Sequence, residues 1–310
     1  MFLDSKINPR MRVILSNDFA GDPDGLVQLA HHLLSPSVDI RGIIGSFFSE
    51  FFGQDNSADH ACTAVRELLE IMNLKGKYNV YKGADSPLDE NNLKLSEGSE
   101  FIIKEAMRRD TNLPLYILCG ASLTDIASSV LKEPGVAEKT TVVWIGGNEY
   151  SDTFKKLSIC PPVEYNLAMD IEAAKIIFSS TVNFWQVPRD VYRQALMSYS
   201  ELATKVKPCG KAGKYLAEKL EWAMGLAAEN GMNLGEAYVM GDSPLVLLTA
   251  LQSGFDPDPS SSEFVLRPAP DIDSSGQYIE NSNNRKIRVY TKLDVRILLE
   301  DFYLKLSMLK

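Results

Sequence analysis

The stretch MRVILSNDFAGDPDGLVQLAHHLL, residues 11–34, joins an apolar run, an acidic loop and a second apolar segment. Its first part is continuously apolar over VIL, which is typical of a strand buried on both faces. The part from 24 to 34 has apolar residues at helical spacing and predicts a helix. Between them Asp18, Asp22 and Asp24 share a short loop with two glycines and a proline. The stretch therefore predicts a strand–loop–helix unit with its negative charge concentrated in the loop.

The same alternation of elements continues along the chain. Apolar, β-branched runs predict strands at 12–16, 39–46, 78–83, 114–120, 139–147 and 182–188. Helical spacing predicts helices near 57–73, 98–109, 122–132 and 170–180. We therefore expect an α/β fold, with a mixed, mostly parallel, Rossmann-like open sheet and helices on both of its faces.

The second half of the chain is more helical. Segments 201–207, 211–231 and 243–254 predict helices packed against one edge of the sheet, and 254–284 is dense in Pro, Ser, Asp and Asn, which indicates a long excursion or hairpin region. A strand and a helix close the chain over 285–309. Because there is no internal repeat and no clean linker, we expect residues 1–310 to form a single domain.

Composition limits the partners and the compartment. With 45% hydrophobic and 24% charged residues the chain has ordinary globular composition, and its net charge of −9 argues against a nucleic-acid or membrane partner. The four cysteines, at 62, 119, 160 and 209, form no CxxC pair, which favours reduced thiols over a zinc or disulfide framework. No signal peptide and no run of membrane-spanning length is found, so we expect a cytoplasmic protein.

The acidic loop has two interpretations at this level. One carboxylate before a helix is an ordinary N-cap. Three crowded carboxylates, however, cost free energy unless a cation or protons relieve their repulsion. Ligands of open α/β sheets bind at the carboxyl ends of the strands, and oxygen donors there suit Ca²⁺ or Mg²⁺. A further oxygen donor is Asp242 in a Gly-Asp-Ser-Pro turn, which could equally cap a helix.

Six segments, taken in order, resemble the inosine–uridine-preferring nucleoside hydrolase family over nearly the whole chain. SNDFAGDPDG is similar to its acidic hallmark and GDSPLVLLTAL to its late Asp-Pro turn. The other four similar segments are VYKGADSPL (80–88), residues 116–147, PPVEYNLAMDIEAAKIIFSS (161–180) and VPRDVYRQALMS (187–198). The resemblance implies an N-glycosyl hydrolase in purine or pyrimidine salvage. It would cleave ribonucleosides, or a related ribosyl or glycosyl substrate, with Ca²⁺ and as a homodimer or homotetramer.

The resemblance also implies roles for single residues. Asp18 aligns with the family's general base and metal ligand, and Asp242 aligns with its late metal ligand. A backbone carbonyl ligand would come from Cys119 or Leu118. The resemblance implies that a cation-bound water attacks after the N-glycosidic bond has largely broken.

Asp22 and Asp24 compete for a second metal-ligand role and a ribose-binding role, because Pro23 separates two carboxylates that are adjacent in the family. We assign Asp24 to the metal, with Asp22 as the competing ligand, and Asp22 to a ribose hydroxyl. The residues that align with ribose-binding positions of the family are Glu164, Asn166, Ser49 and Ser158, with Glu50 as an alternative to Ser49. Without the resemblance, Glu164 and Asn166 would be an ordinary polar pair in a loop.

The chain departs from the family at the leaving-group acid. The family's His before the late Asp is Gly241 here, and His31, His32 and His60 lie in predicted helices where structural roles are expected. Aromatic residues that could donate to or stack on a base are Tyr165, Tyr192, Trp185 and Trp222. Phenylalanines at 47, 48, 51 and 52 could form an apolar wall or a subunit interface. A catalytically reduced metal- and sugar-binding relative is therefore the alternative, as is a hydrolase of another glycosidic substrate.

Overall fold

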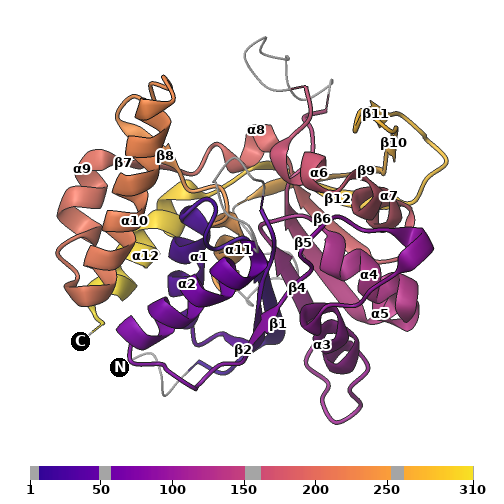
Figure 1. Cartoon of the computed structure of the whole chain (residues 1–310), viewed down its shortest axis with the longest axis horizontal. Helices are drawn as coiled ribbons and strands as arrows, with labels where there is room; N and C mark the ends of the chain where they lie inside the picture. The colour runs from indigo at the N-terminus through magenta and orange to yellow at the C-terminus, as the bar shows by residue number, and fades with distance from the viewer. Residues whose placement is uncertain (1–6, 49–56, 151–161, 253–261, 310) are drawn as a thin grey trace.

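The computed structural model describes residues 7–48, 57–150, 162–252 and 262–309. Eight strands form one sheet that crosses the molecule (Figure 1). In spatial order they are β3 (Val80–Lys82), β2 (Val38–Gly45), β1 (Met11–Asn17), β4 (Leu115–Cys119), β5 (Thr140–Ile145), β6 (Asn183–Val187), β12 (Lys286–Lys292) and β9 (Glu263–Pro268). All neighbouring pairs are parallel except β12 with β9. The predicted mixed, mostly parallel sheet is confirmed.

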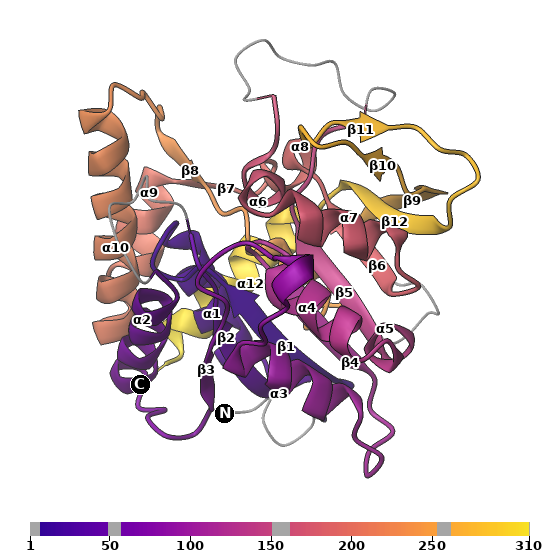
Figure 2. The same cartoon turned by 45° about the vertical axis from the view of Figure 1, so that its right-hand side comes forward.

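The continuous apolar runs are explained by helices on both faces (Figures 1 and 2). Val13 and Leu15 of β1 belong to one core, and Ile14 belongs to the other. The first core is covered by α1 (Asp24–Leu33), α2 (Ser57–Ile71), α10 (Gly210–Glu229), α11 (Pro244–Leu247) and α12 (Val295–Ser307). The second is covered by α3 (Glu97–Ala106), α4 (Thr124–Lys132), α5 (Gly135–Lys139) and α7 (Ile171–Ser179). Strands drawn from residues 11 to 292 thus share one sheet.

Short elements connect these layers. They are η2 (Glu90–Asn92), α6 (Tyr165–Met169), α8 (Arg189–Tyr192), α9 (Tyr199–Glu201) and the π-helical turn η3 (Leu202–Val206). Two small antiparallel sheets pair β7 (Leu196–Ser198) with β8 (Ala237–Val239), and β10 (Asp271–Ile272) with β11 (Tyr278–Ile279). The second pair lies within the region expected to form a hairpin. Among the described residues no helix combines the length and the apolar character that crossing a bilayer requires.

Two expectations for the second half were wrong. The expected helices do not pack against an edge of the sheet: α10 packs on α1, α2 and α12, and α11 packs on α1 and on the inner strand β5. The helix expected over 243–254 is reduced to the four residues of α11. The Thr249 hydroxyl bonds the Leu245 carbonyl, and Leu251 bonds back to Val246. After Leu248 the backbone bonds leave the i−4 pattern, because the N–H groups of Thr249 and Leu251 both bond the Val246 carbonyl, and the helix ends there.

The topology of the sheet places a crevice at the acidic loop. The chain moves from β1 to β2 and β3 on one side, then returns to β4 on the other side of β1. Ser16 of β1 lies opposite Cys119 of β4, so both strands end at the same level. Loops leaving two such strands diverge, which makes this reversal the usual binding position of an open α/β sheet.

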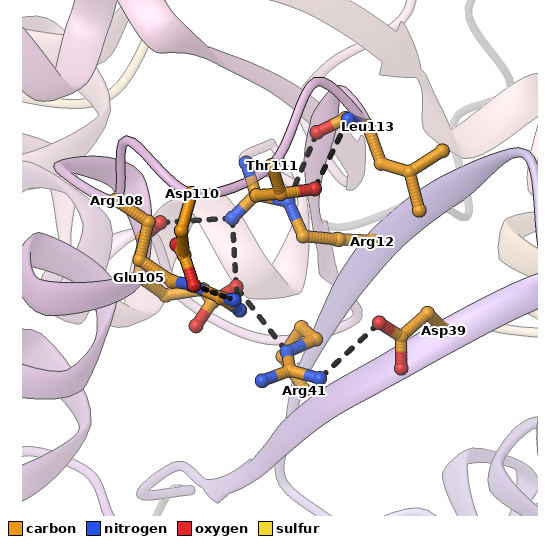
Figure 3. A network of polar contacts seen from close by, with 8 residues as sticks. All are labelled: Arg12, Asp39, Arg41, Glu105, Arg108, Asp110, Thr111 and Leu113. Carbon is orange, nitrogen blue, oxygen red and sulfur yellow. Dashed lines mark hydrogen bonds and ion pairs between the residues drawn. The ribbon is translucent and has the colours of Figure 1, made fainter.

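The amino end of β1 carries a different set of charges (Figure 3). Arg12 is only 6% exposed, and its guanidinium lies 2.7 Å from the carboxylate of Glu105 on α3, which is 3% exposed. Arg41 and Arg108 contact the same carboxylate at 3.2 and 3.0 Å. Arg12 also donates to the Leu113 carbonyl at 2.9 Å. Each buried charge at this end therefore has partners of opposite sign or a hydrogen bond.

Candidate functional site

Two aspartates of the acidic loop are buried where β1 ends. Asp18 directly follows the strand, is 4% exposed, and its backbone N–H donates to Asn17 Oδ1 at 2.8 Å. The chain then turns back, since the Gly21 N–H bonds the Asp18 carbonyl at 2.6 Å. Asp24 is the first residue of α1 and is also 4% exposed. The local bonding thus holds both carboxylates beside the strand end and out of bulk water.

Asp242 joins them from the other end of the chain. Asn17 Nδ2 donates to Asp242 Oδ2 at 2.9 Å, and the Asp242 N–H donates to Asp24 Oδ2 at 2.8 Å. The structure therefore brings the predicted Asp18, Asp24 and Asp242 together. Sequence analysis missed Asn17, whose only signal is its position beside Asp18.

Asp22 turns in another direction from Asp24. Tyr238 of β8 donates its hydroxyl to Asp22 Oδ1 at 2.9 Å, and the Asp24 N–H reaches the same oxygen at 3.3 Å. Pro23 between them is the residue before α1. Asp24 therefore contacts Asp242, whereas Asp22 contacts Tyr238 of β8.

These four carboxylates repel one another. Burial and the charges of Asp242 and Asp22 raise the pKa of Asp18 well above its usual value. Burial, followed by repulsion from the other three carboxylates, raises the pKa of Asp24 well above its usual value. Burial also raises the pKa of Asp22. Burial raises the pKa of Asp242 to about 7, although the hydrogen bond from Asn17 opposes the shift. No lysine or arginine of the described residues forms an ion pair with any of the four.

The donor set fits a hard divalent cation in kind. All the acidic groups offer oxygen, the ligand that Ca²⁺ and Mg²⁺ prefer. Only a glycine fits beside them at position 120, because a Cβ there would lie 2.6 Å from Asp242 Oδ1 and 2.4 Å from Asn17 Nδ2. Within the described ranges no three His, Cys, Asp or Glu side chains already converge as a metal site. Binding would therefore exchange the present hydrogen bonds of Asp242 and Asp24 for cation contacts.

Glu164 is held firmly on the opposite side of the crevice. It caps α6 and is 1% exposed. Its Oε2 accepts from the Gly147 N–H at 2.8 Å and the Leu167 N–H at 3.0 Å, and its Oε1 accepts from the Tyr192 hydroxyl at 3.1 Å. Burial raises the pKa of Glu164, and these hydrogen bonds oppose the shift.

Asn166 ties this side to the sheet. Its Nδ2 donates to the Ile145 carbonyl at 2.8 Å and the Gly120 carbonyl at 3.1 Å, at the ends of β5 and β4. Both Glu164 and Asn166 line the same cavity as the aspartates. Glu164 and Asn166 are therefore not an ordinary polar pair in a loop, because they share a cavity with the acidic cluster.

The remaining predicted site residues differ in their outcome. Cys119 ends β4, but its thiol bonds the carbonyls of Ala121 and Ser122 and is buried in the second core. Burial raises the pKa of that thiol, so it stays protonated, and a ligand role would fall to its backbone carbonyl. Ser49 and Ser158 lie outside the described residues, as does Glu50.

One cavity of about 1020 Å³ contains the acidic cluster, Glu164 and Asn166. The apolar part of its lining comes from β7, α10, β8 and the segment before β8. The residues there are Leu196, Ala223, Leu226, Ala227, Met232, Leu234 and Val239. Such a cavity combines a charged end for a polyhydroxylated group with an apolar end for a ring.

The aromatic and histidine candidates separate clearly. Tyr165 and Tyr192 line the cavity, whereas Trp185 packs on Tyr116 and Tyr290. Trp222 is 48% exposed and is not among the cavity residues.

The first two histidines have structural partners, as predicted. His31 bonds Asp301, and His32 bonds Thr249 and Gln28. His60 is exposed on α2. Phe47 and Phe48 are buried, and Phe48 lies against the turn at Gly21, which favours a wall beside the acidic loop over an exposed interface.

Comparisons with known proteins point to one family and one fold. The profile of the family described as inosine-uridine preferring nucleoside hydrolase matches residues 13–298. A pyrimidine-specific ribonucleoside hydrolase, RihB, of Escherichia coli is 23% identical over 169 residues, which are 54% of this chain and 51% of that protein. The chain thus spans about half the length of this curated relative.

Two solved structures have the same fold. A purine-preferring ribonucleoside hydrolase from Gardnerella vaginalis has a TM-score of 0.75 at 20% identity, over 96% of this chain and 98% of that one. An inosine-uridine preferring nucleoside hydrolase from Bacillus anthracis has a TM-score of 0.68 at 14% identity, over 96% and 99%.

Proposed function

The chain belongs to the inosine-uridine preferring nucleoside hydrolase family, and from this premise we propose that it hydrolyses the N-glycosidic bond of a nucleoside. The observation that carries the proposal is the single cavity in which buried, uncompensated aspartates face Glu164 and Asn166. The sugar would lie between these two sets of side chains. The apolar end of the cavity would receive the leaving group.

We assign Ca²⁺ to the acidic end, held by Asp18, Asp24 and Asp242, with Asp22 and the Cys119 carbonyl as further candidate donors. When bound, a divalent cation lowers the pKa of a coordinated water and holds vicinal hydroxyl groups. The mutual repulsion of the aspartates, visible in their raised pKa values, supports a cation at this place.

The proposed reaction assigns the proton to Asp18. The bond between the sugar carbon and the base nitrogen breaks, and its electron pair leaves with the base. The cationic sugar that develops is stabilised by the surrounding carboxylates. The water oxygen then bonds to the sugar carbon, and Asp18 accepts the proton that the water releases. Glu164, Asn166 and Asp22 would accept from or donate to the hydroxyls that orient the sugar.

One observation favours a second candidate function. At residue 241, where the leaving-group acid of the family would stand, this chain has glycine, and the ring of Tyr192 lies beside it. A protein with an intact cation and sugar site but no acid would bind nucleosides and release only leaving groups that need no protonation. We keep this sugar-binding relative as the alternative.

One assay separates the two candidates. Purified protein with Ca²⁺ is offered a panel of ribonucleosides and p-nitrophenyl riboside, and sugar release is measured. Turnover of a natural nucleoside supports the hydrolase. Turnover of the nitrophenyl riboside alone supports the acid-deficient alternative, and ribose binding without any turnover would exclude both hydrolytic activities on these substrates.

The substrate and the assembly are proposed more broadly. A ribonucleoside is the first choice, and a related ribosyl or glycosyl compound the second. We propose a homodimer or homotetramer in the cytoplasm, as the family resemblance implies. Gel filtration with light scattering tests the assembly directly.

A further inference from the structure

Tyr192 connects the two sides of the cavity. It ends α8, and its hydroxyl donates to Glu164 Oε1 at 3.1 Å. Its ring lies over Gly241, where an added Cβ would be 3.3 Å from Tyr192 Cδ2 and 3.3 Å from Asp24 Oδ2. The residue before Asp242 can therefore carry no side chain without displacing the ring or the carboxylate.

We propose that Tyr192 is a positioning residue that fixes the Glu164 carboxylate and so sets how strictly the site requires one sugar hydroxyl. This inference rests on the proposed function, because it gives Glu164 a sugar hydroxyl as its ligand. Neither the sequence pattern nor the family resemblance assigned this role to Tyr192.

The acceptor capacity of Glu164 shows why the contact matters. A carboxylate offers about four lone-pair positions. Two on Oε2 are used by the backbone N–H groups of Gly147 and Leu167, and one on Oε1 is used by Tyr192. The Asn166 N–H is a further backbone donor to this carboxylate, so Tyr192 adds a side-chain donor to a set of backbone ones. Without the tyrosine hydroxyl, the buried Oε1 would lose the side-chain contact that directs it, and its orientation toward an incoming hydroxyl would be less fixed.

A proton-donor role fits Tyr192 less well than a positioning role. Burial and the neighbouring Glu164 charge raise the pKa of Tyr192 well above 10. The hydroxyl thus keeps its proton at neutral pH and directs it at Glu164. The Tyr192 ring also lines the cavity, so its orientation affects the shape of the proposed substrate-binding site.

The first test is Tyr192→Phe, which keeps the ring and removes the hydroxyl. Its matched control is Tyr215→Phe, because Tyr215 donates to Glu67 at 3.0 Å on the surface, away from the cavity. Both variants are assayed with a cleaved nucleoside and its 2′-, 3′- and 5′-deoxy analogues. We expect Tyr192→Phe to lower kcat/KM for the parent nucleoside by about tenfold, as for one lost hydrogen bond to a charged group.

The analogue series gives the decisive readout. The wild type is expected to discriminate most strongly against the analogue that lacks the hydroxyl bound by Glu164. Tyr192→Phe should reduce that one ratio and leave the other two unchanged, and Tyr215→Phe should alter none of them. Unchanged discrimination in Tyr192→Phe would overturn the proposal, because a merely structural tyrosine lowers all rates together.

A second measurement does not depend on turnover. Thermal unfolding of Tyr192→Phe, Glu164→Gln and the double variant forms a cycle, with Tyr215→Phe and Glu67→Gln as the matched exposed cycle. We expect the first pair to depart from additivity in Tm by about 2 °C and the exposed pair to be additive. Additivity in the first cycle overturns the proposal even if the protein is active. Departure from additivity in a protein that cleaves no nucleoside supports the positioning contact and refutes only the proposed function.

Discussion

Buried charges are paired with opposite charges at the amino end of β1 and are not so paired, among the described residues, at its carboxyl end. At the amino end, the buried Arg12 faces the buried Glu105 at 2.7 Å, and two further arginines contact the same carboxylate (Figure 3). At the carboxyl end, Asp18, Asp24 and Asp242 are as deeply buried, yet no described lysine or arginine forms an ion pair with them. One strand of seven residues thus separates a neutralised cluster from an unneutralised one.

The difference separates structural charges from functional ones. A buried charge that only stabilises the fold needs its partner within the protein, since an unpaired one costs several kcal/mol. A cluster of like charges that persists without such a partner indicates a partner from outside the chain. Changes at the carboxyl end should therefore alter activity, and changes at the amino end should alter stability.

The largest expected effect is on catalysis, from Asp18→Asn. Losing the proposed proton acceptor should lower kcat by about 10²–10⁴-fold, the usual contribution of a general base. The cation-free protein should not lose stability, because one member of a repelling cluster has become neutral. Asp110→Asn, at the exposed end of the Arg12 network, is the matched control and should keep full activity. A near wild-type kcat in Asp18→Asn would refute the assignment.

Next in size is the loss of stability on breaking the amino-end network with Arg12→Met. It leaves Glu105 buried with only two arginine contacts, so the free energy of unfolding should fall by about 3 kcal/mol, near the lower limit for a broken buried pair. Urea denaturation at neutral pH measures this loss. Arg108→Met, whose side chain is 27% exposed, should cost less than about 1 kcal/mol. Equal losses in the two variants, or a reduced kcat in folded Arg12→Met, would contradict the comparison.

A separate effect should follow pH in the cation-free protein. The pKa of Asp242 is raised to about 7 in the folded state from an ordinary 3.8, so folding opposes its ionised form. The cost is fully present above pH 7 and disappears as the folded carboxyl takes up its proton between about pH 7 and 4. Wild type should therefore be less stable than Asp242→Asn at pH 8, with the gap closing toward pH 4.

Added Ca²⁺ should remove the same cost at pH 8 by stabilising wild type. A cation at 100 times its Kd contributes about 2.7 kcal/mol. Ca²⁺ should stabilise Asp242→Asn much less than wild type. Differential scanning calorimetry of the two proteins with Ca²⁺ or EDTA measures the difference. A gap that is constant with pH, or equal stabilisation of both proteins, would argue against a cation site at Asp242.

The smallest effect expected is that of Tyr238→Phe, which decides the role of Asp22. Removing the hydroxyl that bonds Asp22 Oδ1 should raise KM by about tenfold if Asp22 holds a sugar hydroxyl, because a hydrogen bond to a charged group is lost. The Ca²⁺ affinity, measured by calorimetry, should then be unchanged. A weakened Ca²⁺ affinity with an unchanged KM would assign Asp22 to the cation instead.

The sequence predicted the sheet, and the closeness of some candidate site residues, for physical reasons. Strands buried on both faces leave continuous apolar runs, and these located β1, β4 and β5 within a residue or two. The loops after parallel strands meet at one edge of the sheet, so Asp18 could be expected near Asp24. Asp242 was a candidate oxygen donor that could equally have been a helix cap, and the family resemblance assigned its role; the role of Glu164 came only from that resemblance.

Other features could not be predicted because they depend on distant contacts. Asn17 and Tyr238 gain their roles from partners 225 and 216 residues away. The shortening of α11 is a change of backbone acceptors after Leu248, and the apolar periodicity of residues 243–254 does not indicate it. Tyr192 was considered as a base-stacking residue, whereas its hydroxyl is directed at Glu164.

The bond between Asn17 and Asp242 also has a consequence for the order of folding. It closes a loop of 225 residues, so the β1–α1 unit can form long before its last carboxylate arrives. During synthesis the acidic loop therefore exists first as an incomplete half-site. A cation that needs both halves binds after the main folding barrier and should slow unfolding without speeding folding. Calcium would then lengthen the lifetime of the native protein by slowing its unfolding, and would leave its folding rate unchanged.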